Sequence, residues 1–260
     1  MNVIVIIQAR MGSSRLPNKV LMPLADKPAI QHVIERARMI SGITDVVLAT
    51  TTSHVDDPLD EFCKTLGVPV YRGSEDDVLD RYYQAAILYN ADIIVRITGD
   101  CPLLDPSEST KVVKRLLEHN VDYVSNVNPP MLPDGLDTEA MTVAALKCTW
   151  KRAEKRSERE HVTLYIYSNP SDFRIDSIAY PTDRSHYRLT LDEKSDYTLL
   201  QLLFTRLKES QRFGFVDEII EILESDWMLR NINDHIKRNE GLEKSRFKDG
   251  EKELAQRRKK

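Results

Sequence analysis

The stretch Val3–Leu24, VIVIIQARMGSSRLPNKVLMPL, decides the fold of this chain. It opens with an unbroken β-branched apolar run, Val3–Ile7, which is typical of a strand buried on both faces of a parallel sheet. The polar loop that follows carries three cations, Arg10, Arg15 and Lys19. Such a loop, leaving the carboxyl end of the first strand, lies where α/β sheets bind ligands. The cations and the backbone N–H groups suit a polyphosphate, although a basic loop is often only a solvated turn.

Two familiar phosphate-binding motifs are absent from this stretch. It contains no G-x-x-x-x-G-K-[S/T] loop, and no G-x-G-x-x-G follows the strand. The sequence therefore argues against a P-loop NTPase and against a Rossmann-type dehydrogenase.

The composition is that of an ordinary globular protein. Of 260 residues, 41% are hydrophobic and 30% charged, and the formal net charge of −4 gives no reason to expect nucleic acid as a partner. Cys63, Cys101 and Cys148 lack C-x-x-C spacing, so neither a disulfide framework nor a structural zinc site is indicated. No apolar run approaches the roughly 18 residues of a membrane span, and the first residues run directly into a strand without a basic n-region or a small-residue cleavage site. We expect a cytoplasmic protein with no membrane partner.

Strand and helix patterns alternate along the chain and predict an α/β fold. Further strands are expected at 45–50, 68–71, 92–97, 123–127, 173–179 and 187–191. Helices are expected at 29–40, 58–66, 108–119, 143–155 and 197–207, with two more between 216 and 238. Ser74 is expected to cap a helix, and Ser157 with Glu160 has the spacing of a capping box. The segment 240–260 has few apolar residues, which indicates a solvated helix or a frayed tail.

A second informative stretch, T-G-D-C-P-L-L-D-P, follows the strand at 92–97. Asp100 comes directly after a buried parallel strand, with Gly99 permitting a tight turn, and is well placed to hold a hard cation. Asp105, which precedes Pro106, is instead better explained as a helix cap. Cys101 is interpreted as a filler residue.

Polar residues in the second half of the chain mark a further candidate region. The segment 126–142, NVNPPMLPDGLDTEAMT, is a long irregular loop that leads into a short strand, and such loops tend to be functional. Asp134 and Gly135 can equally be explained as a turn, and a histidine at a helix start such as His161 is more often structural.

Several of these motifs resemble one family. Q-A-R-M-G-S-S-R-L-P-N-K-V-L is similar to the signature loop of the sugar-activating cytidylyltransferases, especially the branch named for the spore coat polysaccharide biosynthesis protein SpsF. G-D-C-P at 99–102, P-D-G-L-D-T-E at 133–139, R-E-H at 159–161 and R-L-T-L-D-E-K-S-D-Y at 188–197 match its other motifs. The family usually has glycine at the position of Asn18, but asparagine tolerates a left-handed backbone.

The resemblance implies a three-layer nucleotide-diphospho-sugar transferase (Rossmann-like) fold with a mostly parallel central sheet. The resemblance covers residues 1 to about 207. We expect one nucleotidyltransferase domain at 1–239, with a nucleotide-binding half at 1–125, an acceptor-sugar half with C-terminal helices at 126–239, and a charged tail at 240–260. A homodimer is usual in the family, although no feature of this sequence demands one.

The site residues implied by the resemblance fall into four groups. The residues implied to be catalytic are Arg10, Arg15, Lys19 and Asp100. Those implied to bind the nucleotide are Gln8, Ala9, Arg10, Gly12, Ser13, Ser14, Arg15, Lys19, Arg72, Gly73 and Gly99. The two implied Mg²⁺ ligands are Asp100 and Asp192. Those implied to bind the sugar substrate are Asn126, Asp137, Glu139, Arg159 and His161.

The implied reaction moves CMP from CTP to an acidic or modified sugar, releasing pyrophosphate, in surface polysaccharide biosynthesis. The cations neutralise the triphosphate and Mg²⁺ activates the acceptor hydroxyl, so no dedicated protein base is required. The alternative is a glycosyltransferase of GT-A-like fold, but no convincing D-x-D follows a strand. A catalytically silent scaffold protein is a third possibility, against which Lys19, Asp100 and Asp192 argue.

Overall fold

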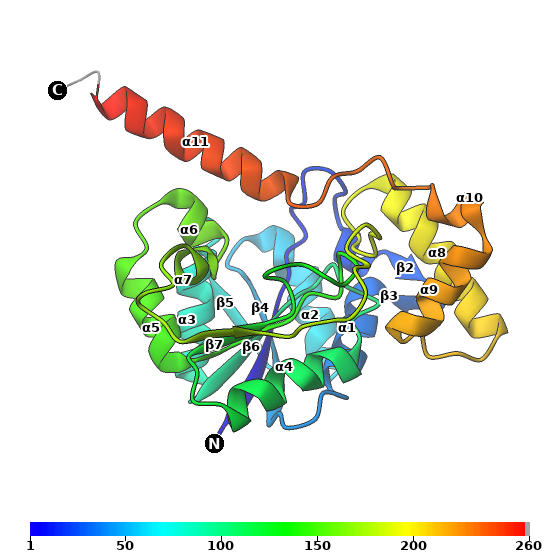
Figure 1. Cartoon of the computed structure of the whole chain (residues 1–260), viewed down its shortest axis with the longest axis horizontal. Helices are drawn as coiled ribbons and strands as arrows, with labels where there is room; N and C mark the ends of the chain where they lie inside the picture. The colour runs from blue at the N-terminus through cyan, green and yellow to red at the C-terminus, as the bar shows by residue number, and fades with distance from the viewer. Residues whose placement is uncertain (258–260) are drawn as a thin grey trace.

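A seven-stranded sheet forms the centre of the computed structural model, which describes residues 1–257 (Figure 1). The order is β5-β4-β1-β6-β8-β7-β9, and within the described residues β8 alone runs against the other six. The bounds are β1 Val3–Gln8, β4 Asp45–Thr51, β5 Val70–Gly73, β6 Ile93–Thr98, β7 Tyr123–Ser125, β8 Glu139–Thr142 and β9 Ile175–Ser177. A separate ribbon pairs β2 (Pro23–Leu24) with β3 (Lys27–Pro28).

Helices cover both faces of the sheet and so make the predicted three layers (Figure 1). Side chains of alternate β1 residues point to opposite cores, because successive strand side chains face opposite ways. One face packs against α1 (Ala29–Ala37), α2 (Asp57–Thr65) and α4 (Pro106–Glu118). The other packs against α3 (Val78–Leu88), α5 (Val143–Arg152) and α7 (Leu164–Ser168), with α6 (Arg156–Glu160) beside α3.

A third apolar core lies beside the sheet. It is built by α8 (Lys194–Glu209), α9 (Val216–Ser225) and α10 (Trp227–Arg230), together with leucines from the segments between the strands. The turns η1 (Lys19–Leu21) and η2 (His54–Asp56) complete the connections. The predicted α/β class and mostly parallel sheet are therefore confirmed.

Two predicted helix caps failed because the helices begin at other residues than expected. The helix α3 begins at Val78, and its cap is Asp77, whose carboxylate accepts a hydrogen bond from the Asp80 N–H. The predicted Ser74 cap is wrong, because Ser74 lies outside the helix. The helix α6 begins at Arg156, so the predicted Ser157 capping box is also wrong; Glu158 accepts from the Lys155 N–H instead.

The predicted strand at 187–191 is extended but makes a single bridge, between Arg188 and Asp134. Its backbone instead bonds to the loop after β6, where Leu191 N donates to the Asp100 carbonyl at 2.7 Å. This connection brings Asp192 next to the carboxyl end of β6.

The charged tail forms a helix, α11 (Glu240–Arg257), that crosses above α6 (Figure 1). The expectation that it is simply solvated is wrong for its first turns, because Ser245 is buried and the Ser157 N–H donates to the Asp249 carboxylate. The rest of the predicted tail, residues 258–260, lies outside the described residues.

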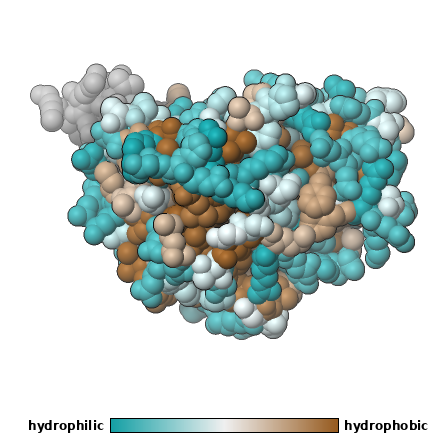
Figure 2. All heavy atoms as spheres, turned by 60° about the horizontal axis from the view of Figure 1, so that its bottom comes forward, coloured by the Kyte–Doolittle hydropathy of each residue, from teal (hydrophilic) through white to brown (hydrophobic). Residues whose placement is uncertain are grey.

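The outer surface is mixed in character. Figure 2 shows apolar residues reaching the surface in patches between hydrophilic side chains. Among the helices that the structure describes, none combines the length and the apolar character that crossing a membrane demands. A homodimer stays a prediction.

Candidate active site

Backbone conformation and hydrogen bonds of the backbone N–H groups hold the basic loop in place. Asn18 has φ of 60°, the left-handed conformation that asparagine tolerates, and its N–H donates to the Met11 carbonyl at 3.0 Å. The Met11 N–H in turn donates to the buried carboxylate of Asp56 at 2.7 Å. These bonds fold the loop back over the end of β1.

Lys19 joins the two predicted metal ligands. Its ammonium lies 2.6 Å from an Asp100 oxygen and 3.0 Å from an Asp192 oxygen, and Lys19 is only 8% exposed. Arg15 also forms an ion pair with Asp192. Asp100 arrives from β6, which lies beside β1 with Gln8 paired to Thr98, and Asp192 arrives from the extended segment bonded to the Asp100 carbonyl. Residues from three distant parts of the chain therefore meet at one point.

The cation decides the charge state of Asp100. Burial by itself raises the pKa of this carboxyl, but the Lys19 ammonium outweighs burial and lowers the pKa to about 2. Asp100 is therefore ionised at neutral pH.

A cavity of about 430 Å³ opens beside this cluster, and we call it the nucleotide cavity. It is lined by six basic residues and three acidic ones, so the balance of charge favours an anion. Eight of the predicted nucleotide-binding residues line it: Gln8, Ala9, Arg10, Ser13, Ser14, Arg15, Lys19 and Gly99.

Three predicted nucleotide-binding residues lie elsewhere. Arg72 donates to the carbonyls of Thr51 and Ser53 at 2.8 and 2.7 Å and pairs with Asp57 at 2.6 Å, so its guanidinium fastens the loop after β4. Gly73 and Gly12 also do not line the nucleotide cavity. The site assignment of these three residues stays a prediction.

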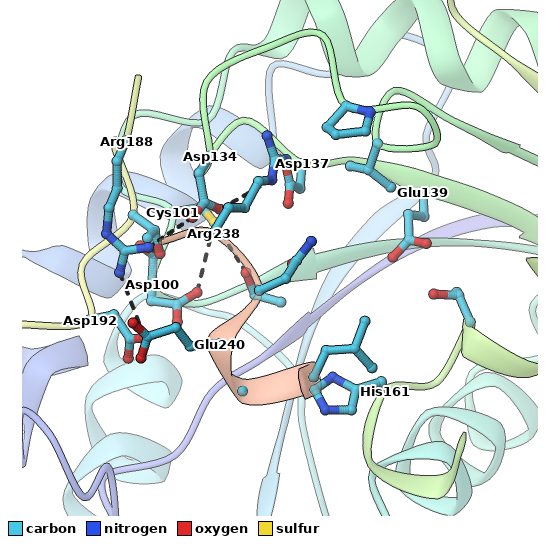
Figure 3. Close-up of a pocket in the computed structure, with 18 of the residues that line it drawn as sticks. Asp100, Cys101, Asp134, Asp137, Glu139, His161, Arg188, Asp192, Arg238 and Glu240 are labelled. Carbon is cyan, nitrogen blue, oxygen red and sulfur yellow. Dashed lines mark hydrogen bonds and ion pairs between the residues drawn. The ribbon is translucent and has the colours of Figure 1, made fainter. Parts of the chain in front are cut away.

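A second cavity, of about 470 Å³, continues from Asp100 and Asp192, and we call it the acceptor cavity. Its lining includes six basic and six acidic residues, so it has no excess of charge. Figure 3 shows two sides: Arg188, Asp134, Arg238 and Glu240 gather near Asp100, while Glu139 and His161 lie across the opening.

The three carboxylates of the P-D-G-L-D-T-E motif differ in what they offer a ligand. Asp134 pairs with Arg188 at 2.9 Å, and Asp137 pairs with Arg238 at 2.6 Å. Glu139 is 2% exposed and is held by Arg96 and Tyr123. Desolvation raises the pKa of Asp134, and it raises the pKa of Asp137 to about 7 against the pull of Arg238. Asp137 is therefore, of the three carboxyls, the one that can be either protonated or ionised near neutral pH.

The three remaining predicted sugar-binding residues separate into one lining residue and two supports. His161 lines the acceptor cavity, and burial lowers its pKa, which favours a neutral imidazole. Arg159 does not line either cavity, because it is bound to Asp77 at 2.9 Å and to the Trp150 carbonyl at 2.6 Å.

Asn126 is the second support. It is buried, and its amide donates to the Leu136 carbonyl at 2.8 Å while accepting from the Thr138 N–H at 2.8 Å. It thereby shapes the 136–138 loop behind the acceptor cavity.

Sequence reasoning missed several lining residues. Arg96 lies within β6, Arg238 follows α10, and the first turns of α11 line both cavities through Gly241. The Ser245 hydroxyl lies 3.3 Å from His161 Nε2 and 3.0 Å from Glu160, so it ties α11 to the cavity wall. The arginine inside an otherwise apolar strand, DIIVRI, was a signal that could have been used.

The carboxylate pair fits a divalent metal in one particular way. Asp100 and Asp192 converge on a single cation position, and carboxylate oxygens are ligands that Mg²⁺ prefers. Among the residues that the structure describes, no group of three or more His, Cys, Asp or Glu side chains could hold a metal ion. Two carboxylates suit Mg²⁺ that is also bound by substrate phosphates.

Comparison with known proteins agrees with this geometry. The model of one family, described as cytidylyltransferase, matches residues 4–246. This chain belongs to the cytidylyltransferase family. Among its relatives, an uncharacterised protein of Methanocaldococcus jannaschii is 41% identical, over 91% of this chain and 96% of its own length. The spore coat polysaccharide biosynthesis protein SpsF of Bacillus subtilis is 33% identical, over 80% of this chain and 88% of its own length.

A solved structure extends the likeness to three dimensions. A cytidylyltransferase from Leptospira borgpetersenii superposes with a TM-score of 0.82 and 34% identity, covering 89% of this chain and 98% of that one. The cytidylyltransferase family and the nucleotidyltransferase fold are therefore confirmed.

Proposed function

We propose that this cytidylyltransferase transfers CMP from CTP to an acidic or modified sugar, with release of pyrophosphate, in surface polysaccharide biosynthesis. The observation that carries the proposal is the meeting of Lys19 with Asp100 and Asp192 at the junction of the two cavities. The relation to SpsF supports a role in polysaccharide biosynthesis.

The nucleotide cavity supplies charge. Arg10, Arg15 and Lys19 bind the triphosphate and neutralise the charge that builds on the leaving pyrophosphate. Asp100 and Asp192 would hold Mg²⁺, and the bound ion would polarise the α-phosphate and lower the pKa of the acceptor hydroxyl. Because the reacting groups are aligned at one junction, much of the barrier is lowered by positioning.

The acceptor cavity supplies hydrogen bonds. Asp137 and Arg238 face the cavity as a pair that can accept from and donate to sugar hydroxyls, and His161 contributes a ring nitrogen from the opposite side. Its balanced charge suits a hydroxyl-rich ligand better than a second polyphosphate.

Release of pyrophosphate from the purified protein tests the proposal. The protein is incubated with Mg²⁺, each of the four NTPs in turn and a panel of acidic sugars. We expect release that requires both CTP and one of the sugars. Pyrophosphate release with no sugar present would contradict the proposal. Transfer of sugar from a nucleotide sugar, with release of the nucleotide and no pyrophosphate, would also contradict it and would favour the glycosyltransferase alternative, against which the cytidylyltransferase match counts.

Two further expectations belong to this proposal. We expect Mg²⁺ to be the working metal and the enzyme to act in the cytoplasm on soluble substrates. Omission of Mg²⁺ and its replacement by Ca²⁺ in the same assay test the first, and cell fractionation tests the second.

A further inference from the structure

The ammonium of Lys19 occupies the position that a metal ion between the two aspartates would take. It lies 2.6 Å from Asp100 and 3.0 Å from Asp192, and its side chain is 11% exposed. Arg15 supplies a second positive charge to Asp192. Arg188 adds a third positive charge, 3.8 Å from Asp192. The two carboxylates are thus already neutralised by cations of the chain itself.

A divalent cation cannot join this arrangement without displacing Lys19. Two positive charges at such separations repel strongly in a partly buried site, and each carboxylate has its favourable partner already. The described residues provide no third acidic, histidine or cysteine ligand that would repay the displacement. The free protein is therefore a poor metal site.

A nucleotide changes this balance because its phosphates offer a second set of anionic oxygens. Lys19 lines the nucleotide cavity, and its long side chain can turn from the carboxylates to a phosphate. The phosphates also complete the coordination of Mg²⁺, which binds readily through one or two carboxylates plus phosphate oxygens.

We infer that Lys19 is the resident counter-cation of the metal site, and that metal is bound tightly only together with the nucleotide, which draws Lys19 away from the aspartates. The inference rests on the proposed function for the identity of the nucleotide as CTP. It assigns Lys19 a positioning role before the reaction, in addition to its contact with phosphate.

Binding of Mn²⁺, followed by the electron paramagnetic resonance signal of the free ion, tests this inference without any turnover. The samples are the full-length wild type, Lys19→Met and Lys27→Met, each without nucleotide. Lys27 is a matched control because it pairs with Glu35 at 2.7 Å away from both cavities. We expect Lys19→Met to bind Mn²⁺ at least about tenfold more tightly than the wild type, and Lys27→Met to match the wild type.

Addition of CTP completes the test. In the wild type we expect CTP to increase the Mn²⁺ bound beyond the sum for protein alone and CTP alone. Equal Mn²⁺ affinity of the wild type and Lys19→Met without nucleotide would overturn the inference, as would tight binding by the wild type without CTP.

A second variant guards against loss of folding. Lys19→Met leaves two carboxylates without their shared cation, so we expect a lower Tm that Mn²⁺ restores. Lys19→Met/Asp100→Asn should recover most of the Tm without metal and lose the gained Mn²⁺ affinity. A double variant that kept the tight Mn²⁺ binding would overturn the role of Asp100 here.

The outcome is separable from that of the proposed function. Absence of pyrophosphate release with every sugar would refute the reaction while leaving the Mn²⁺ result intact. Equal Mn²⁺ affinities with normal turnover would refute the counter-cation role alone.

Discussion

Asp100 and Asp137 are both desolvated carboxyls in adjoining cavities, yet their pKa values move in opposite directions. Lys19 lowers the pKa of Asp100 to about 2, whereas desolvation raises that of Asp137 to about 7 although Arg238 is 2.6 Å away. Asp134 adds a like charge beside Asp137 and so works in the same direction as desolvation. The sign of the shift is therefore set by the local excess of cations.

The same contrast separates the two cavities. The nucleotide cavity has six basic and three acidic lining residues, and the acceptor cavity has six of each. An excess of positive charge stabilises a polyphosphate, while a balanced set offers donors and acceptors without selecting for net charge. If this contrast governs function, the nucleotide cavity works by charge and the acceptor cavity works by hydrogen bonding.

The largest effect on turnover is expected in the nucleotide cavity. Lys19→Ala or Asp100→Ala should lower kcat by on the order of 10²–10³, because each removes a charge that stabilises the transition state. Steady-state pyrophosphate release measures the change, with Lys27→Ala as a control expected to be normal. Near-normal rates for either active-site variant would contradict the assignment of charge stabilisation to the nucleotide cavity.

A smaller effect on a different constant is expected at the other end. Asp137→Asn should raise the KM for the acceptor by about tenfold, roughly 1.4 kcal/mol, and leave the KM for CTP unchanged. The same kinetic assay applies, and Asp172→Asn, at the Arg152 surface pair, serves as the control. A change confined to the KM for CTP would show that Asp137 acts in the nucleotide cavity and not in the acceptor cavity.

The pH dependence of folding stability should also distinguish the two cavities. The folded pKa of Asp137 is above its ordinary 3.8, so its protonated form stabilises the fold below that value, and this contribution is lost as pH rises toward 7. Between pH 4.5 and 7.5, Asp137→Asn should lose less stability than the wild type, by at least about 1.4 kcal/mol, one pKa unit. Urea unfolding at the two pH values measures it; equal losses would contradict the raised pKa.

Asp100 should show the reverse behaviour. Its folded pKa is below the ordinary value, so its contribution is present above pH 3.8 and is lost as pH falls toward 2. Asp100→Asn should therefore flatten the stability profile only below about pH 4, a window that does not overlap that of Asp137.

The smallest effect is expected where α11 closes both cavities. Ser245→Ala removes hydrogen bonds to His161 and Glu160, each worth about 0.5–1.5 kcal/mol. KM values for both substrates should rise about two- to fivefold, with kcat unchanged. A change confined to one substrate would show that α11 belongs to one cavity only.

Much of the nucleotide cavity was predictable from local sequence. An apolar β-branched run followed by polar residues specifies a buried parallel strand and a loop at its carboxyl end, and this occurs at both β1 and β6. Lys19 and Asp100 follow neighbouring strands of the sheet, so their proximity follows from the fold class. Asp105 was likewise recognisable as a cap, and its carboxylate does accept from the Ser107 N–H.

The acceptor end was less accessible to such reasoning. Arg159 is a long polar side chain whose direction depends on a distant partner, and the structure binds it to Asp77. Arg72, from the predicted nucleotide-binding set, was misplaced for the same reason and is bound to Asp57. The tail at 240–260 has few apolar residues, so its burial depends on single polar contacts such as that of Asp249 with Ser157.

The sequence by itself determined which segments are buried, where they end and which polar residues follow them, because burial and turns depend on neighbouring residues. The tertiary structure alone decided that Asp192 meets Asp100 through Lys19, that Asp137 becomes hard to ionise, and that α11 lies over the site. Those outcomes depend on distances between residues far apart in the chain, and electrostatic interactions vary with such distances in a way that no local pattern records.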